Sequence, residues 1–254
     1  MHTRILVSAL LLCGAIPATV LAQTDEIEIY DASIAEQGKF TLTVHSNYTP
    51  DGPRQAAFPG GVVPNHSDNG AFEWAYGAAD FLELGLYLPV YTVTNRGNPQ
   101  LDGAKFRTLW VSPHAKQREF FYGMNFEFSY NVHHWEETRT ALEIRPIGGL
   151  HEGRWDVIFN PIIDYDFKGI GNAHFAPAER VAYNASQRWA FALEHYSDLG
   201  PLQGFDALPQ QQHTLWAVTD YTVNDANSVE FGIGHGFTSV SEDVILKLIV
   251  NHNF

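Results

Sequence analysis

The sequence predicts an all-β fold: a transmembrane antiparallel up-and-down β-barrel of about 12 strands. Three observations predict it. Apolar and polar residues alternate with period two along most of the chain, and the spacing of amphipathic helices is nearly absent. Most alternating segments run for about 8–12 residues, the length that a tilted strand needs to cross a bilayer. The chain also opens with a segment typical of exported proteins.

Residues 1–22 form the first element, a predicted signal peptide. Arg4 is the only charged residue in it, and an apolar run follows directly. Val20 and Ala22 are small enough at the two positions that matter for signal-peptidase cleavage before Gln23. The apolar run is shorter than the roughly 20 residues of a membrane-spanning helix, so we expect cleavage and not anchoring.

The composition excludes several classes. The chain has 29 acidic and 15 basic residues and a formal net charge of −14, which makes it a poor partner for nucleic acid. Its one cysteine, Cys13, leaves with the signal, so disulfides do not stabilise the mature protein. An exported chain without an apolar helix is periplasmic, secreted or inserted as a barrel. A soluble barrel or sandwich that carries a ligand stays open as the alternative to a membrane barrel.

Residues 23–38 form the second element, which is acidic. We expect an N-terminal periplasmic segment here, with a small plug as the alternative.

Residues 39–254 form the predicted barrel domain. The twelve alternating segments begin near Lys39, Gly70, Phe81, Ala104, Phe120, Arg139, Arg154, Glu179, Arg188, Gln212, Ser228 and Asp243. The longest connections, 49–69, 92–103, 167–178 and 198–211, all follow odd-numbered strands, so they share one side. Outer-membrane barrels place long loops outside and short turns in the periplasm, so we expect both ends of the barrel in the periplasm.

Most strands have one apolar face, which we assign to lipid. In the third strand Leu82, Leu84, Leu86, Leu88 and Val90 share this face, and in the fifth the even-numbered residues 120–130 do. The fourth and tenth strands, 104–112 and 212–220, are apolar on both faces. We place Arg107 inside, because an arginine on lipid near the midplane costs about 2–4 kcal/mol.

The opposite faces supply candidate lumen-lining residues. These are Glu83, Arg107, Asn125, Glu127, Glu143, Arg145, Asn160, Asp164, Asn184, Glu194, Glu230 and Lys247. Carboxylates outnumber bases among them, so an open lumen should prefer cations. The alternative is that these charges pair across neighbouring strands and close the barrel. The 49–69 loop, rich in proline, either folds inward as a constriction or stays on the surface.

No catalytic, cofactor-binding or metal-binding residue is predicted. His133 and His134 are adjacent and therefore point to opposite faces of a strand, and other histidines lie singly in loops. His195 and Ser197 share a strand face, as in outer-membrane phospholipases. The next strand offers Gln212 and His213 there, and no asparagine to orient the imidazole.

The last segment, 244–254, resembles the assembly signal of bacterial outer-membrane proteins, because it alternates and ends on the aromatic Phe254. The chain also resembles an uncharacterised proteobacterial barrel group, through FPGGVVP (58–64), EWAYG (73–77), FYGMNFEF (121–128) and VEFGIG (229–234). A looser similarity is to transporters linked to aromatic-compound degradation.

These resemblances imply a location in the cell outer membrane of a Gram-negative bacterium. They imply outer-membrane lipid, the barrel-assembly machinery and a small solute as partners. The expected function is a passive pore or transporter for small solutes. A closed structural or adhesive barrel and, third, an outer-membrane lipid-modifying enzyme are the alternatives.

Overall fold

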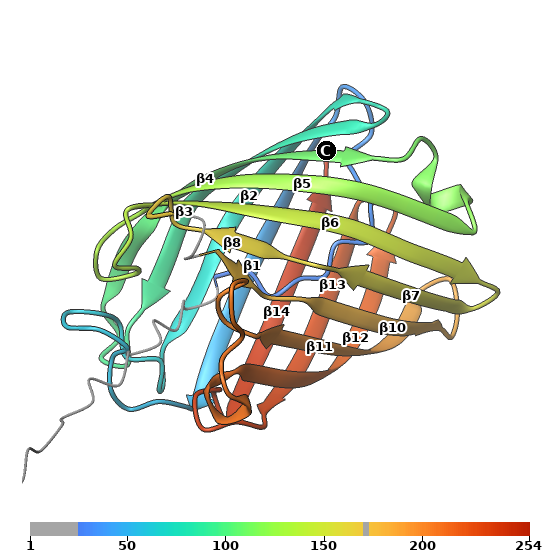
Figure 1. The fold of residues 1–254 in the computed structure, drawn as a ribbon. Coiled ribbons are helices and arrows are strands. Elements are labelled where there is room, and N and C mark those ends of the chain that lie inside the picture. Colours follow the sequence, from blue (N-terminus) through green and yellow to red (C-terminus); the bar gives the residue numbers. More distant parts are fainter. Residues whose placement is uncertain (1–24, 170–172) are drawn as a thin grey trace, which may run out of the picture.

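The computed structural model describes residues 25–169 and 173–254, and the expected signal peptide lies outside them. The described chain is a closed barrel of β-strands (Figure 1). The strands are β1 (Phe40–Asp51), β2 (Asp68–Ala79), β3 (Leu82–Val93), β4 (Pro99–Val111), β5 (Phe120–Asn131), β6 (Thr140–Glu152), β7 (Trp155–Asn160), β8 (Ile163–Tyr165), β9 (His174–Phe175), β10 (Ala178–Asn184), β11 (Trp189–Asp198), β12 (Gln212–Asn224), β13 (Asn227–Gly236) and β14 (Val244–Asn253). Two short 3-10 turns, η1 (Ala115–Gln117) and η3 (Leu208–Gln210), lie between strands.

Antiparallel pairing joins each strand to its neighbours in sequence, and β1 pairs with β14 to close the ring. β7 and β8 both pair with β6 and together occupy one strand position, as do β9 and β10 after them. The ring therefore has 12 strand positions, which confirms the predicted barrel. Among the described residues, no helix has the length and apolar character needed to cross a membrane.

The two ends of the barrel differ in their connections. We call the end with the connections 52–67, 94–98, 132–139, 199–211 and 237–243 the loop end. The opposite end, which we call the turn end, has the short connections 80–81, 153–154, 185–188 and 225–226. The 112–119 connection at the turn end is longer because it contains η1. Phe254 also lies at the turn end, where its backbone N–H donates to the Phe40 carbonyl at 3.0 Å.

The outer face of the barrel is a belt of large apolar side chains. Leu193 is 58% exposed, Ile233 48% and Phe126 41%, values that would be unfavourable for so many neighbouring side chains in water. The belt includes Leu86, Leu88, Phe106, Phe128, Leu150, Val157, Phe159, Val181, Leu215, Phe231, Leu248 and Val250. A continuous apolar exterior around a polar interior is the design of a membrane barrel, so the chain lies in the outer membrane.

The structure settles the two strands with ambiguous faces. Arg107 of β4 points inward and is 5% exposed, while Phe106 and Trp110 point to lipid. In β12, Trp216 points inward and Leu215 outward. The indole of Trp216 fits only because Gly232 and Gly234 of β13 face it: a Cβ on Gly234 would lie 2.4 Å from the ring.

One face assignment in β3 was wrong. Val90 was expected on the lipid face with Leu88, but it is almost fully buried inside the barrel. The pairing of β3 with β4 shifts register between Tyr87 and Val90, which adds a residue and turns the following side chains over.

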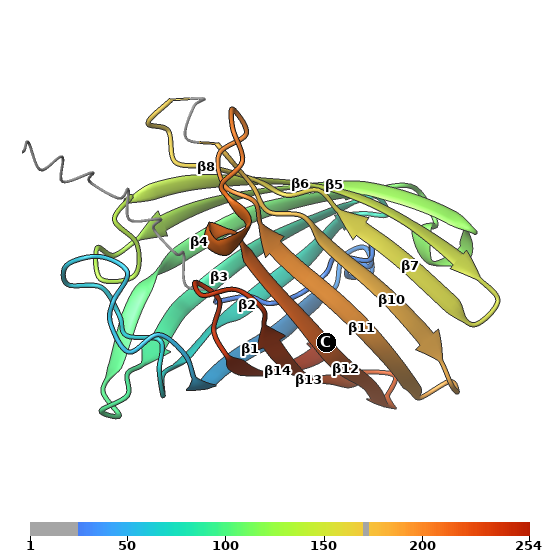
Figure 2. The same ribbon diagram turned by 60° about the horizontal axis from the view of Figure 1, so that its bottom comes forward.

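Residues 25–38, which we call the inner segment, run through the interior of the barrel (Figure 2). Asp25 lies beside Asn47, toward the loop end, and Gln37 bridges to Gly77 at the turn end. We expected residues 23–38 below the barrel, with a plug as the alternative; their described part lies inside. The reason is apolar burial: Ile29, Tyr30 and neighbouring residues pack against the inner wall.

Candidate functional site: the barrel lumen and its inner segment

Asn160 of β7 holds the middle of the inner segment. Its side-chain oxygen accepts from the Tyr30 backbone N–H at 2.8 Å, and its side-chain nitrogen donates to the Tyr30 carbonyl at 3.0 Å. Around Tyr30 the inner segment belongs to no β-ladder, so its backbone groups need other partners, and an amide side chain supplies both a donor and an acceptor. The Tyr30 hydroxyl is 2.7 Å from that of Tyr87 on β3.

Three basic side chains of the wall bind the acidic half of the inner segment. Lys105 lies 2.8 Å from the Asp25 carboxylate. Lys247 donates to the Ile27 carbonyl at 3.1 Å, and Arg145 donates to the Glu28 carbonyl at 3.0 Å.

Farther along, the Ala35 backbone N–H donates to Glu83 of β3 at 2.5 Å. The wall therefore contacts the inner segment along most of its length.

The wall charges pair with one another as well. Lys247 is fully buried and lies 2.6 Å from Glu194 and 2.5 Å from Glu230. Arg180 of β10 joins this group through Glu194 and Asp220. Pairing of this kind offsets the cost of removing charges from water.

A second charged group lies between β2, β3 and β4. Arg107 donates to Glu73 at 2.7 Å through its Nε and to Glu83 at 2.7 Å through Nη2. Cross-strand pairing, one of the two readings of the polar faces, is thus present in the structure.

Most of the candidate lumen residues lie inside the barrel and contact one another or the inner segment. Three acid–base ion pairs involve these candidates. They are Glu83–Arg107, Glu143–Arg145 at 2.8 Å and Glu127–Lys105 at 3.0 Å. Asn125 is fully buried, and neither polar atom of its side chain has a hydrogen-bond partner among the described residues.

Two candidates lie apart from these pairs. Asp164 of β8 lines open space on the loop-end side. Asn184, at the end of β10 by the turn end, donates to Asp156 at 2.7 Å and takes no part in the central pairs.

Two cavities flank the inner segment. The larger, about 370 Å³, lies toward the turn end and is lined by Glu28, Glu73, Arg107, Arg180, Asp220 and Asn251, among others. The smaller, about 240 Å³, lies toward the loop end and is lined by Asp25, Lys105, Glu127, Asp164, Tyr196 and Glu242, among others. The inner segment lines both, and Glu28 borders each.

At the loop end, two of the connections contact each other. Phe58 and Val62 of the 52–67 connection are buried, and the Val62 N–H donates to the His134 carbonyl at 3.0 Å. His134 itself lies 2.8 Å from the buried Asp102 of β4. The long loop is thus packed against the 132–139 connection.

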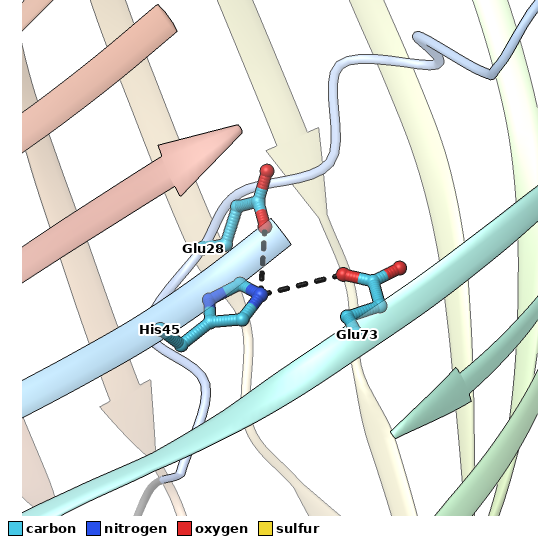
Figure 3. A group of neighbouring side chains, drawn as sticks. All are labelled: Glu28, His45 and Glu73. Atoms are coloured by element: carbon cyan, nitrogen blue, oxygen red, sulfur yellow. Dashed lines mark hydrogen bonds and ion pairs between the residues drawn. The ribbon is translucent and has the colours of Figure 1, made fainter. Parts of the chain in front are cut away.

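Sequence reasoning missed one group inside the lumen. His45 of β1 lies between Glu28 of the inner segment and Glu73 of β2 (Figure 3). Its Nε2 is 3.3 Å from Glu73 Oε2 and 3.9 Å from Glu28 Oε2. Strand alternation places His45 and Glu73 on the inner face, but nothing in the sequence brings Glu28 to them.

The arrangement around Ser197 does not assemble a nucleophile. Its hydroxyl donates to the Pro177 carbonyl at 3.1 Å. His195 instead lies 2.9 Å from Glu179 and 3.2 Å from His213 through its two ring nitrogens. Nucleophilic catalysis needs the base within reach of the hydroxyl, and among the described residues these two make other bonds.

Comparison with known proteins supports the fold. No family model matches the chain, and no curated protein matches it in sequence. An outer-membrane channel from Pseudomonas putida F1 superposes with a TM-score of 0.64 at 11% identity, covering 90% of this chain and 100% of that one. The KdgM porin gives 0.58 at 9% identity, over 84% and 99%, and the NanC porin gives 0.56 at 7%, over 84% and 98%. The chain therefore has the barrel fold of outer-membrane channels.

Proposed function

We propose that the protein is a passive pore for small solutes across the outer membrane, with the inner segment controlling its opening. The observation that carries this proposal is the lumen itself: polar, lined by ionisable side chains, and hollow on both sides of one extended segment. Buried charges do not make a purely structural barrel more stable, because well-packed apolar side chains in their place would give the same stability. That the similar solved structures are porins and channels agrees with it.

The charge of the lumen favours cations. The lining of the smaller cavity contains more acidic than basic side chains. Asp25, Glu127, Asp164 and further carboxylates line it, with two bases, Lys105 and Arg145. A narrow passage lined mainly by negative charge raises the local concentration of cations and repels anions. Small cationic or neutral solutes are the expected cargo.

The test is conductance of the purified full chain in planar bilayers under a salt gradient. We expect a reversal potential of the sign that marks cation preference. Asp164→Asn should reduce it, because this carboxylate lines the open part of the passage. Asp225→Asn, in the exposed turn between β12 and β13, is the matched control and should leave it unchanged. Anion preference would contradict the charge argument.

The second candidate is a closed structural or adhesive barrel. The paired charges and the occupied lumen favour it. It predicts no conductance either from the full chain or from variants that loosen the inner segment, and that result would replace the pore proposal.

Contact with the barrel-assembly machinery stays a prediction. The similarity to transporters linked to aromatic-compound degradation, which would add small aromatic solutes to the cargo, also stays a prediction.

A further inference from the structure

Three side chains, one each from the inner segment, β1 and β2, meet inside the barrel: Glu28, His45 and Glu73 (Figure 3). One ligand-type atom of each lies within 4.8 Å of the others. The inner segment supplies Glu28, and the barrel wall supplies the other two. Anything that binds all three therefore ties the inner segment to the wall.

The geometry fits a small metal ion. Metal–ligand distances of about 2.0–2.2 Å for imidazole nitrogen and carboxylate oxygen place neighbouring tetrahedral ligands about 3.3–3.5 Å apart. His45 Nε2 is already 3.3 Å from Glu73 Oε2. Nε2 of His45 is 3.9 Å from Glu28 Oε2, and the three ligand atoms lie within 4.8 Å of one another, so binding needs the Glu28 carboxylate to move closer. The Glu28 side chain, at 34% exposed, has room for this movement.

Arg107 orients the Glu73 carboxylate so that one oxygen is available to a metal ion. It donates to Oε1 at 2.7 Å through Nε, which leaves Oε2 directed at His45. A hydrogen bond that fixes the outer oxygen of a ligating carboxylate is a common feature around metal ions.

The surrounding charge favours a cation in spite of Arg107. Glu26 lies nearby in the inner segment, and its buried Oε1 has no hydrogen-bond partner among the described residues. The same holds for Asp25 Oδ2. Both carboxylates belong to the acidic half of the inner segment, and they add negative charge on the side of Glu28.

The larger cavity offers an ion access and space for a fourth ligand. Glu28 and Glu73 both line the larger cavity of about 370 Å³, which has room for water beside these two carboxylates. Three protein ligands plus water is a usual coordination for Zn²⁺. An imidazole among the ligands favours Zn²⁺ and related transition metals over Mg²⁺ and Ca²⁺, which prefer oxygen.

We propose that Glu28, His45 and Glu73 bind a divalent transition-metal ion, with Zn²⁺ as the probe, and that the bound ion fastens the inner segment across the lumen. Binding does not depend on the protein being a pore. The effect on conduction rests on the proposed function.

Binding is measured by calorimetric titration of the detergent-solubilised full chain with Zn²⁺ and, separately, Mg²⁺. Co²⁺ absorption spectra report directly on nitrogen and oxygen ligation. We expect Zn²⁺ to bind with one site per chain and Mg²⁺ not to compete. His45→Gln and Glu28→Gln should each weaken Zn²⁺ binding at least about tenfold. Heat-modifiable gel mobility shows that each variant is folded.

Matched controls separate this site from adventitious binding. His235→Gln removes an exposed histidine at the loop end, and Glu36→Gln removes an exposed carboxylate of the inner segment itself. Both should bind Zn²⁺ as the unmodified protein does. Unchanged affinity in Glu28→Gln would overturn the proposal, and Glu28→Gln keeps the test valid if His45→Gln fails to fold.

Conductance separates the two proposals. Zn²⁺ should lower the conductance of the unmodified protein and leave that of Glu28→Gln unchanged. Conductance that does not respond to site-bound Zn²⁺ would overturn the fastening role. Absence of conductance with no metal present would instead count against the pore and leave the binding result standing.

Discussion

Asn160→Ala should release the inner segment from the wall. The substitution removes both hydrogen bonds to Tyr30 and leaves a buried N–H and a buried carbonyl without partners. An unpaired buried group costs about 1–3 kcal/mol, so the loss of two costs roughly 2–4 kcal/mol of docking free energy, if water partly replaces them. Each 1.4 kcal/mol is a factor of ten, so the ratio of undocked to docked segment should rise about 30- to 700-fold.

Single-channel recording measures that ratio as the fraction of time spent in the highest conductance level. Asn125→Ala is the control: Asn125 is also a fully buried lumen asparagine, but it has no bond to the inner segment. We expect the open fraction to rise in Asn160→Ala and stay unchanged in Asn125→Ala. Equal open fractions in both variants and the unmodified protein would refute the view that the inner segment is the closing element.

Three further predictions concern assembly and stability. Deleting Phe254 removes the bond of its N–H to Phe40 and the terminal aromatic, so less heat-modifiable folded barrel should form, while any barrel that folds should keep its conductance. Gly234→Val should lower the free energy of unfolding by about 1–3 kcal/mol in urea titrations, because the new Cβ would lie against the ring of Trp216. Gly148→Ala should leave it unchanged, because Gly148 faces open space. Equal urea midpoints for the two variants would refute the packing argument. Burial of Glu136 in the 132–139 connection raises the pKa of its carboxyl to about 7, above its unfolded value, so its contribution to stability is fully present below about pH 4 and is lost as the pH rises through 7. Glu136→Gln should make the urea midpoint less dependent on pH between about pH 5 and pH 8.5. An unchanged dependence of the midpoint on pH would contradict the assignment to Glu136.

Strand number, strand order and most inward side chains were predictable because lipid and water impose strict alternation on every barrel strand. Alternation places Lys247 inside, and the cost of an arginine facing lipid places Arg107 inside; the structure has both there. β4 begins at Pro99, earlier than the expected start near Ala104, because its first residues pair with the end of β3 in a stretch without the alternating pattern.

The interior could not be predicted in the same way. The path of the inner segment depends on partners far away in sequence, such as Asn160 for Tyr30, and no local pattern encodes them. Trp216 faces inward because glycines on another strand leave room for its ring. The Glu28–His45–Glu73 group shares the first difficulty, since Glu28 belongs to the inner segment, for which the sequence predicts a periplasmic position with a plug as the alternative.

The direction in which the inner segment runs bears on how the barrel is built. The chain passes from near the loop end to the turn end as residues 25–38, reverses, and returns as β1. β1 is also the strand that meets β14 when the ring closes. We therefore expect the inner segment to lie against β1 before the β1–β14 seam forms, because an already closed ring would have to be threaded by a charged strand. Assembly would then end when β14 pairs with β1 and closes the barrel around residues 25–38.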